Sequence, residues 1–235
     1  MQHKIYAYIS DGGVEEEISQ GVGRLAGVLG LNNLIMFYDS NEIQLSTECN
    51  VVMKEDTAAK YEAWGWKVTT INGNDPDEIR KALVEAQTEE KRPTLIIGRT
   101  IMGKGALKED GSSYEHSIKT HGAPLGGKSY ENTIKHLGGD PENPFVIFPE
   151  VQQLYANRRE ELKTIVAARR KNEAEWAAAN PEKAAQLKEW FSGNAPKVDW
   201  TAVQQKPGSA TRAASAACLG VLAEQVPNMV CSSAD

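Results

Sequence analysis

Short apolar runs alternate with longer amphipathic segments in the first part of the chain, and this alternation constrains the fold more than any other feature. The apolar runs occupy residues 5–9, 34–38, 67–71 and 94–98. Between them lie segments with a helical period, at residues 13–29, at 55–64 and from Asp75 onward. This order of elements predicts an α/β fold, with a doubly wound, mostly parallel sheet and helices on both faces.

The segment 13–29 is predicted to be one helix that packs on the sheet. Its apolar residues recur at helical spacing and are expected to face the core: Val14, Ile18, Val22, Leu25, Ala26 and Leu29. Its interior also holds three glycines, Gly21, Gly23 and Gly27. Because glycine lowers helix propensity, we expect these positions to allow close packing of the helix on the sheet.

Beyond residue 98 the pattern changes. Residues 100–128 are polar, rich in glycine and without periodicity, which is typical of a long functional loop. After it, helices are predicted at 151–176, 181–191 and 211–225, and a last strand at 229–231. We therefore expect three parts: an α/β domain over 1–147, a helical connector over 148–207, and the start of a second α/β domain over 208–235.

Composition narrows the classes of function. The net charge is −6 and no basic stripe offsets it, which argues against nucleic-acid binding. No apolar run is long enough to cross a membrane. The three cysteines, Cys49, Cys218 and Cys231, are widely spaced, which indicates reduced thiols of a cytoplasmic protein and not a disulfide framework.

Polar side chains follow the first two predicted strands. Asp11 comes directly after the first strand, and Asn41 comes shortly after the second. In a parallel sheet these strand ends share one edge, where ligands bind. A carboxylate and an amide oxygen suit Mg²⁺, which completes its shell with phosphate and water. The pair therefore predicts a metal–diphosphate site, although each residue taken alone is more typical of a turn or a helix cap.

These residues resemble the metal motif of transketolases, a family of thiamine diphosphate enzymes. The family has Gly-Asp-Gly and, further along the chain, Asn; the matching segments here are residues 10–12 and 39–43. The resemblance implies that Asp11, the Asn41 side chain and the Ile43 carbonyl bind Mg²⁺. It also implies that the backbone of Gly12 approaches the diphosphate. Ser10 replaces the first glycine of the motif and Glu42 replaces a common glycine after the asparagine, and neither change removes a ligand.

A second pair of segments carries the resemblance further. Residues 100–105 read TIMGKG, and residues 120–126 read THGAPLG. A His-Gly-x-Pro-Leu-Gly segment after such a glycine loop is specific to transketolases. It implies that His121 is a catalytic residue that lies near both the cofactor diphosphate and the sugar substrate. Without the resemblance, His121 would be read as an ordinary surface histidine.

Three further residues take roles only from the resemblance. Glu16 matches a family glutamate near the subunit interface, linked to activation of the cofactor; the alternative is a favourable charge in a first helical turn. Arg212 matches an arginine that binds the substrate phosphate, and is otherwise a solvated charge. Asp235 matches a carboxylate near the cofactor at the start of the pyrimidine-binding domain.

The function implied is transfer of a two-carbon ketol unit from a ketose phosphate to an aldose phosphate, as in the pentose phosphate pathway. It would use thiamine diphosphate and Mg²⁺, with Ca²⁺ or Mn²⁺ as substitutes, in a cytoplasmic homodimer. The chain is expected to be partial and to lack the glutamate that activates the cofactor, so that it shows no turnover alone.

Three alternatives stay open. One is another thiamine diphosphate enzyme, such as a deoxyxylulose-phosphate synthase or a keto-acid dehydrogenase component. The second is a non-catalytic half-subunit that only binds the cofactor. The third is a Mg²⁺-dependent phosphatase or receiver-type domain with Asp11 as the phosphate acceptor.

Overall fold

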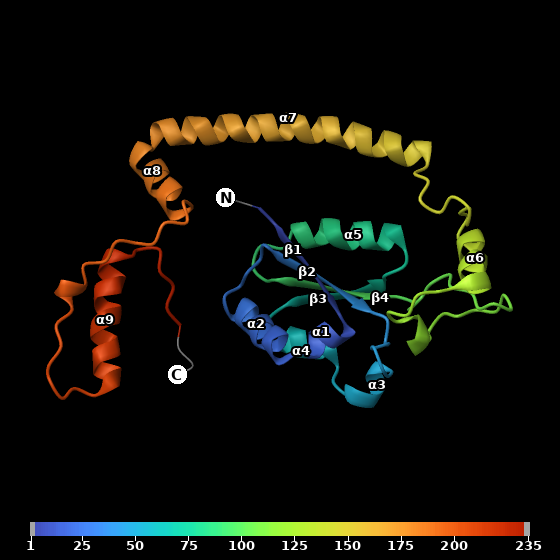
Figure 1. Cartoon of the computed structure of the whole chain (residues 1–235), viewed down its shortest axis with the longest axis horizontal. Coiled ribbons are helices and arrows are strands. Elements are labelled where there is room, and N and C mark those ends of the chain that lie inside the picture. The colour runs from blue at the N-terminus through green and yellow to red at the C-terminus, as the bar shows by residue number, and fades with distance from the viewer. Residues whose placement is uncertain (1–2, 233–235) are drawn as a thin grey trace. The chain divides into compact units, whose positions relative to one another are not determined.

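The computed structural model describes residues 3–232 of the chain. Its contacts divide the chain after Val146 into two compact units. Figure 1 gives the labels of the elements in each unit.

The first unit is built on a sheet of four parallel strands. The strands are β1 (Ile5–Ser10), β2 (Leu34–Ser40), β3 (Lys67–Asn72) and β4 (Thr94–Arg99). They lie in the order β1-β2-β4-β3. Ser10 is in register with Asp39, and Asp39 with Gly98, so the carboxyl ends of the three strands meet at one edge. The predicted parallel α/β sheet is confirmed.

Helices cover both faces of this sheet (Figure 1). One face packs against α1 (Asp11–Glu15), α2 (Glu17–Val28) and α4 (Thr57–Ala63), around the buried side chains of Tyr61 and Leu95. The other face packs against α5 (Pro76–Gln87), around Ile35 and Ile96. A short helix, α3 (Cys49–Val52), follows the loop after β2. Each face therefore has its own apolar core.

The predicted single helix at 13–29 is wrong in two respects. It begins at Asp11 and is interrupted at Glu16, whose ψ of 131° is extended. In addition, only Val14 and Ala26 of the expected core residues are buried. The other expected core residues are largely exposed: Ile18 (76%), Val22 (57%), Leu25 (56%) and Leu29 (61%). The interruption rotates most of the apolar stripe of α2 away from the sheet.

The glycines of α2 do allow close packing, but against α4 and the residues after it instead of the sheet. A Cβ on Gly23 would lie 3.2 Å from the Tyr61 ring, and one on Gly27 only 1.7 Å from the Trp64 carbonyl oxygen. The indole of Trp66 donates a hydrogen bond of 2.7 Å to the Gly23 carbonyl. At Gly21, by contrast, a Cβ would meet nothing within 4 Å.

The N-terminus of α5 is capped by the Asp75 side chain. The Asp75 carboxylate accepts hydrogen bonds from the backbone N–H groups of Asp77 (2.8 Å) and Glu78 (3.3 Å), and Pro76 is the first helical residue. We expect Asp75→Ala to lower the free energy of unfolding by about 1 kcal/mol, because it leaves both donors without this acceptor. Urea denaturation tests this, and an unchanged midpoint would contradict it.

A long loop follows β4, as predicted, and it is better ordered than its sequence indicates. It contains a bridge between Leu107 and Ser113 and a 3₁₀ helix, η1 (Ile118–Thr120). It ends in α6 (Gly127–His136), whose buried residues Ser129 and Thr133 hydrogen-bond to the Leu107 carbonyl. The loop is therefore held to α6 by side-chain contacts.

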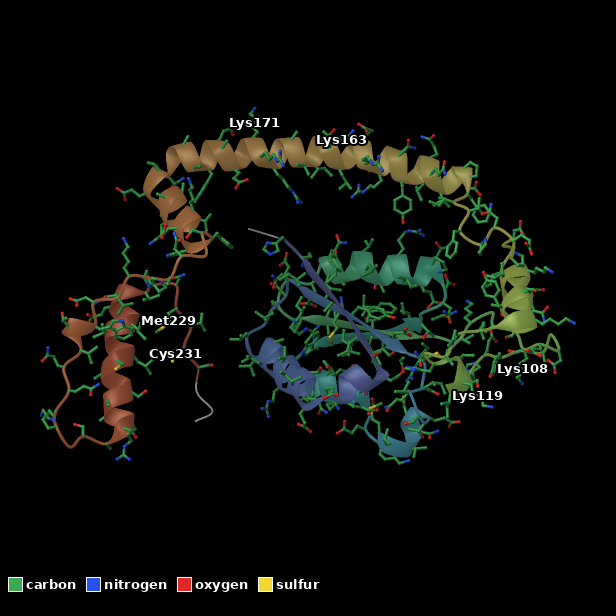
Figure 2. The ribbon with its side chains drawn as sticks, viewed as in Figure 1. Lys108, Lys119, Lys163, Lys171, Met229 and Cys231 are labelled. Atoms are coloured by element: carbon green, nitrogen blue, oxygen red, sulfur yellow. The ribbon has the colours of Figure 1, made fainter. Side chains whose placement is uncertain are left out.

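The second unit is mainly helical. It contains α7 (Pro149–Ala179), α8 (Pro181–Trp190), the 3₁₀ helix η2 (Trp200–Ala202) and α9 (Thr211–Gln225). No residue of α7, all of which is described, is buried, and its side chains project into solvent along its length (Figure 2). The predicted strand at 229–231 is wrong, because these residues form no regular structure and pair with no other strand. Among the described helices, none has the length and apolarity to span a bilayer.

Candidate functional site at the carboxyl edge of the sheet

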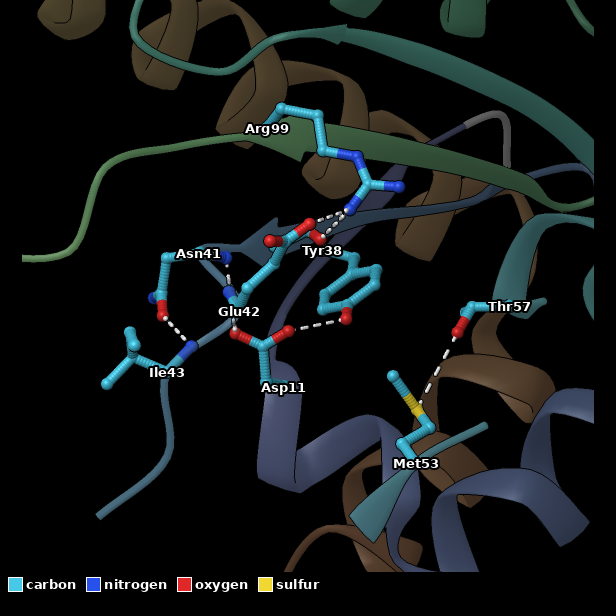
Figure 3. A network of polar contacts seen from close by, with 9 residues as sticks. Asp11, Tyr38, Asn41, Glu42, Ile43, Met53, Thr57 and Arg99 are labelled. Atoms are coloured by element: carbon cyan, nitrogen blue, oxygen red, sulfur yellow. Dashed lines mark hydrogen bonds and ion pairs between the residues drawn. The ribbon is translucent and has the colours of Figure 1, made fainter. Parts of the chain in front are cut away.

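Asp11 lies at the junction of β1 and α1 and is almost fully buried, with 2% of its surface exposed. Its Oδ1 accepts a hydrogen bond of 2.6 Å from the Tyr38 hydroxyl. Its Oδ2 accepts bonds of 3.1 Å from the backbone N–H groups of Asn41 and Glu42. Figure 3 shows the carboxylate between the Tyr38 ring and the loop after β2. The structure therefore brings Asp11 and the Asn41 loop into direct contact, as the strand ends predict.

Asn41 makes a local contact as well. Its Oδ1 accepts a hydrogen bond of 3.0 Å from the backbone N–H of Ile43, which is an Asx-type turn. Asn41 lines a cavity of about 710 Å³ on the α5 side of the sheet, whereas Asp11 lines a cavity of about 330 Å³ on the α4 side. The two residues thus meet at the sheet edge between the two cavities.

The Ile43 carbonyl supplies a further oxygen. Ile43 is buried, and it forms an isolated antiparallel bridge with Glu48. The neighbouring bonds of this bridge run from Cys49 N to the Glu42 carbonyl (3.0 Å) and from Gln44 N to the Thr47 carbonyl (2.8 Å). Within residues 3–232, no backbone N–H group donates to the Ile43 carbonyl.

The chemistry of these donors fits a hard cation. A carboxylate, an amide oxygen and a backbone carbonyl are the types of ligand that Mg²⁺ takes, and the ion keeps its other positions for phosphate and water. In the described part of the chain there is no cluster of three or more His, Cys, Asp or Glu side chains able to hold a metal. A site built on Asp11 would therefore depend on amide and backbone oxygens.

Glu42 and Arg99 flank the Asp11 carboxylate, and the sequence pattern did not identify this pair. Glu42 has a φ of 67°, in the left-handed region that non-glycine residues rarely adopt. Its side chain forms an ion pair of 3.2 Å with Arg99, which also donates to the Ser40 hydroxyl at 2.8 Å. Ser40 and Arg99 are in register on β2 and β4, so strand register places this positive charge beside the site.

Tyr38 and Asp39 are consecutive residues of β2, so their side chains lie on opposite faces of the sheet. The sequence pattern assigned no role to either residue. Burial and the hydrogen bond to Asp11 raise the pKa of Tyr38 above its ordinary value. On the other side, Asp39 accepts hydrogen bonds from the Tyr8 hydroxyl (2.5 Å) and from the Thr100 hydroxyl. Burial, followed by the contact with Asp39, raises the pKa of Tyr8 to about 12. Both tyrosines are therefore hydrogen-bond donors near neutral pH.

Cys49 is the titratable thiol nearest the site. It is buried and lines the cavity on the α4 side together with Asp11. Burial, followed by the negative charge of Asp11, raises the pKa of the Cys49 thiol to about 11. The thiol is therefore protonated near neutrality and is poorly suited to act as a nucleophile.

His121 lies at the end of η1, and its Nδ1 is buried and unpaired among the described residues. The neighbouring Gly122 lies against Leu45, since a Cβ on Gly122 would be 3.8 Å from the Leu45 Cδ1. Leu45 belongs to the loop that contains Asn41 and Ile43. The fold therefore brings the His121 segment to the same loop, from far along the chain.

The remaining predicted residues have few contacts. Gly12 is exposed, and a Cβ there would meet nothing within 4 Å, so its backbone is open to a ligand. Glu16 is exposed at the break between α1 and α2. Arg212 is exposed on α9 of the second unit, and Asp235 lies outside the described residues. Glu15, at the end of α1, is half-buried and accepts a hydrogen bond of 2.5 Å from Gln44.

The open parallel sheet, with polar oxygens gathered at its carboxyl edge, places the first unit in the class of α/β proteins whose ligands bind outside the carboxyl ends of the strands. The family model described as "Transketolase, thiamine diphosphate binding domain" matches residues 1–196. The chain therefore belongs to the transketolase family, which confirms the resemblance.

Individual relatives agree with this assignment. The chain is 36% identical over its whole length to transketolase-1, chloroplastic, of Arabidopsis thaliana and covers 32% of that protein. It is 35% identical to a transketolase of Geobacillus stearothermophilus and covers 35% of it. Among solved structures, a transketolase from Leishmania mexicana has a TM-score of 0.83 at 31% identity, over 96% of this chain and 33% of that one. The chain thus spans about a third of the length of these relatives.

Proposed function

We propose that the first unit binds thiamine diphosphate through Mg²⁺, and that the protein to which this chain belongs is a transketolase. The ion would be held by Asp11, the Asn41 side chain and the Ile43 carbonyl, and the diphosphate would approach the open backbone of Gly12. When bound, the cofactor supplies the carbanion chemistry by which a two-carbon ketol unit passes from a ketose phosphate to an aldose phosphate.

One observation carries the proposal. The buried Asp11 carboxylate bonds to the backbone of the loop that presents Asn41 and Ile43, so carboxylate, amide and carbonyl oxygens come from one small region. The match to the transketolase family does not favour the alternative in which Asp11 is a phosphate acceptor.

The other predicted residues belong to the same proposal. His121 would contact the diphosphate and the sugar, Arg212 the substrate phosphate, and Glu16 the network that activates the cofactor at a homodimer interface. Asp235 would lie near the cofactor. We also propose that residues 1–147, 148–207 and 208–235 are the diphosphate-binding domain, a connector and the start of the pyrimidine-binding domain.

A solved transketolase of Pichia stipitis in complex with sedoheptulose-7-phosphate, 29% identical with a TM-score of 0.81, supports sugar phosphates as the substrate class.

Calorimetric titration of the purified chain with thiamine diphosphate tests the proposed binding. We expect saturable binding in the presence of Mg²⁺, and none when the metal is removed with a chelator. Binding of equal affinity with and without Mg²⁺ would contradict the metal site. Absence of binding under both conditions would contradict cofactor binding by this chain.

His121 provides a further test. We expect His121→Ala to weaken thiamine diphosphate binding by roughly 10- to 150-fold, because a hydrogen bond to a charged group contributes about 1.5–3 kcal/mol. His136→Ala, on the exposed end of α6, is the control and should leave the affinity unchanged. Equal affinities of the two variants would show that His121 does not contact the cofactor.

A further inference from the structure

Asp39 lies near the end of β2, and its side chain is on the α5 side of the sheet, whereas Asp11 is on the α4 side. One of its carboxylate oxygens accepts a hydrogen bond from the Tyr8 hydroxyl on β1. The other accepts a hydrogen bond from the hydroxyl of Thr100, the residue that follows β4. The Thr100 backbone N–H in turn donates to the Ser40 carbonyl at 3.1 Å. Asp39 therefore connects three parallel strands at the edge where they end.

Strand register explains how one side chain reaches both partners. Asp39 stands opposite Ser10 on β1 and Gly98 on β4. Tyr8 and Thr100 are each two residues along the neighbouring chains from these positions, so they are diagonal neighbours on the same face. Because Gly98 has no side chain, nothing on β4 stands directly against the Asp39 carboxylate. The Tyr8 ring, which is largely exposed, also stacks on Phe37, with 6.0 Å between ring centroids.

The two carboxylates hold the same short loop from opposite faces. Asp11 bonds to the backbone N–H groups of Asn41 and Glu42, while Asp39 fixes the end of β2 two residues before Asn41. Asp39, Thr100 and Asn41 also line the same cavity of about 710 Å³. The Asp39 contacts therefore hold the strand end that leads into the Asn41 loop.

We infer that Asp39 is a positioning residue for the metal site, acting through Asn41 and with Tyr8 and Thr100 as its partners. This inference rests on the proposed function, since it concerns the same site. Asp39 does not touch the ion. It holds the loop so that the amide oxygen of Asn41 and the carbonyl of Ile43 can bind the ion together with Asp11.

The test measures Mn²⁺ affinity by electron paramagnetic resonance in the presence of thiamine diphosphate, and the thermal midpoint of each variant separately. The variants are Asp39→Ala, Asp39→Asn and Tyr8→Phe. Tyr6→Phe is the matched control, because Tyr6 lies on the same face of β1 and its hydroxyl forms no hydrogen bond with the described residues. Asp11→Ala reports on the metal site itself.

We expect Asp39→Ala to weaken Mn²⁺ binding by roughly 10-fold, the lower end of the range for groups that support metal ligands, because Asp39 acts on Asn41 through the backbone and not by a direct bond. Asp39→Asn, which keeps one acceptor oxygen, should weaken Mn²⁺ binding less than Asp39→Ala does. Tyr8→Phe should weaken binding in the wild-type background and have no further effect in the Asp39→Ala background, because both changes break the same contact. Tyr6→Phe should bind as the unsubstituted chain does.

Two results would overturn the inference, and they are distinguishable. If Asp39→Ala lowers the thermal midpoint but binds Mn²⁺ as tightly as the unsubstituted chain, while Asp11→Ala does not bind, Asp39 is only structural. If the unsubstituted chain and Tyr6→Phe bind no Mn²⁺, the proposed metal site fails and the inference fails with it.

Discussion

Replacement of Asp11 by alanine should abolish Mg²⁺-dependent binding of thiamine diphosphate. The change removes the one carboxylate among the proposed ligands and leaves the Tyr38 hydroxyl and the N–H groups of Asn41 and Glu42 without their acceptor. We expect the affinity to fall by about 100-fold or more, beyond the range typical of residues outside the metal's own ligands. Calorimetric titration with the cofactor, at fixed Mg²⁺, measures this directly.

Asp56 provides a matched control for this prediction. It lines the same cavity of about 330 Å³ as Asp11, and its carboxylate caps α4 by accepting the Ala59 backbone N–H at 3.0 Å. We expect Asp56→Ala to lower stability by about 1 kcal/mol and to leave cofactor affinity unchanged. Asp11→Asn, of nearly equal size, separates the loss of charge from the loss of volume. Unchanged affinity in Asp11→Ala would contradict the metal assignment.

The largest effect on stability is expected from Gly27→Ala. A Cβ at this position would lie 1.7 Å from the carbonyl oxygen of Trp64, and backbone atoms cannot move aside as a flexible side chain can. The helices α2 and α4 would have to separate, at a cost of about 1–3 kcal/mol. Urea denaturation followed by tryptophan fluorescence is suitable, because Trp64 and Trp66 lie at this contact.

The same helix supplies the control. Gly21 lies in α2, and a Cβ at this position would have no neighbouring atom within 4 Å. Gly21→Ala should therefore stabilise the chain by up to about 1 kcal/mol, the difference in helix propensity between the two residues. The two alanine variants thus change stability in opposite directions. If both variants change the free energy of unfolding in the same direction, the α2–α4 contact does not exclude a side chain at position 27.

Much of the fold could be predicted because local sequence and global structure agree there. The strands β1 to β4 are short apolar runs bounded by turn residues, and α5 carries its own start signal in Asp75 and Pro76. The meeting of Asp11 with the Asn41 loop followed from strand direction alone, since parallel strands end at one edge. The strands and the start of α5 depend on residues close together in the sequence, and the Asp11 contact depends only on the shared direction of β1 and β2.

Other features depend on contacts that periodicity does not contain. The apolar residues of α2 recur at helical spacing and therefore predicted a face buried in the core. After the break at Glu16, however, the side chains of Ile18 and Val22 are exposed. The last predicted strand is absent from the described residues, since a strand needs a neighbour with which to pair.

The partners of the site residues were missed for a related reason. Tyr38, Asp39 and Arg99 acquire their contacts from the register of β1, β2 and β4, which sequence alone did not give. The available signal was the alternation of side chains along β2: Tyr38 and Asp39 are consecutive, so they had to face opposite sides of the sheet.

The most direct test of the metal site is an anomalous diffraction experiment on crystals of the chain grown with Mn²⁺ and thiamine diphosphate. We expect one strong manganese peak within ligand distance of an Asp11 carboxylate oxygen, the Asn41 amide oxygen and the Ile43 carbonyl, with the diphosphate on its open side. A bound cofactor with its manganese peak away from these three oxygens would contradict the proposed site.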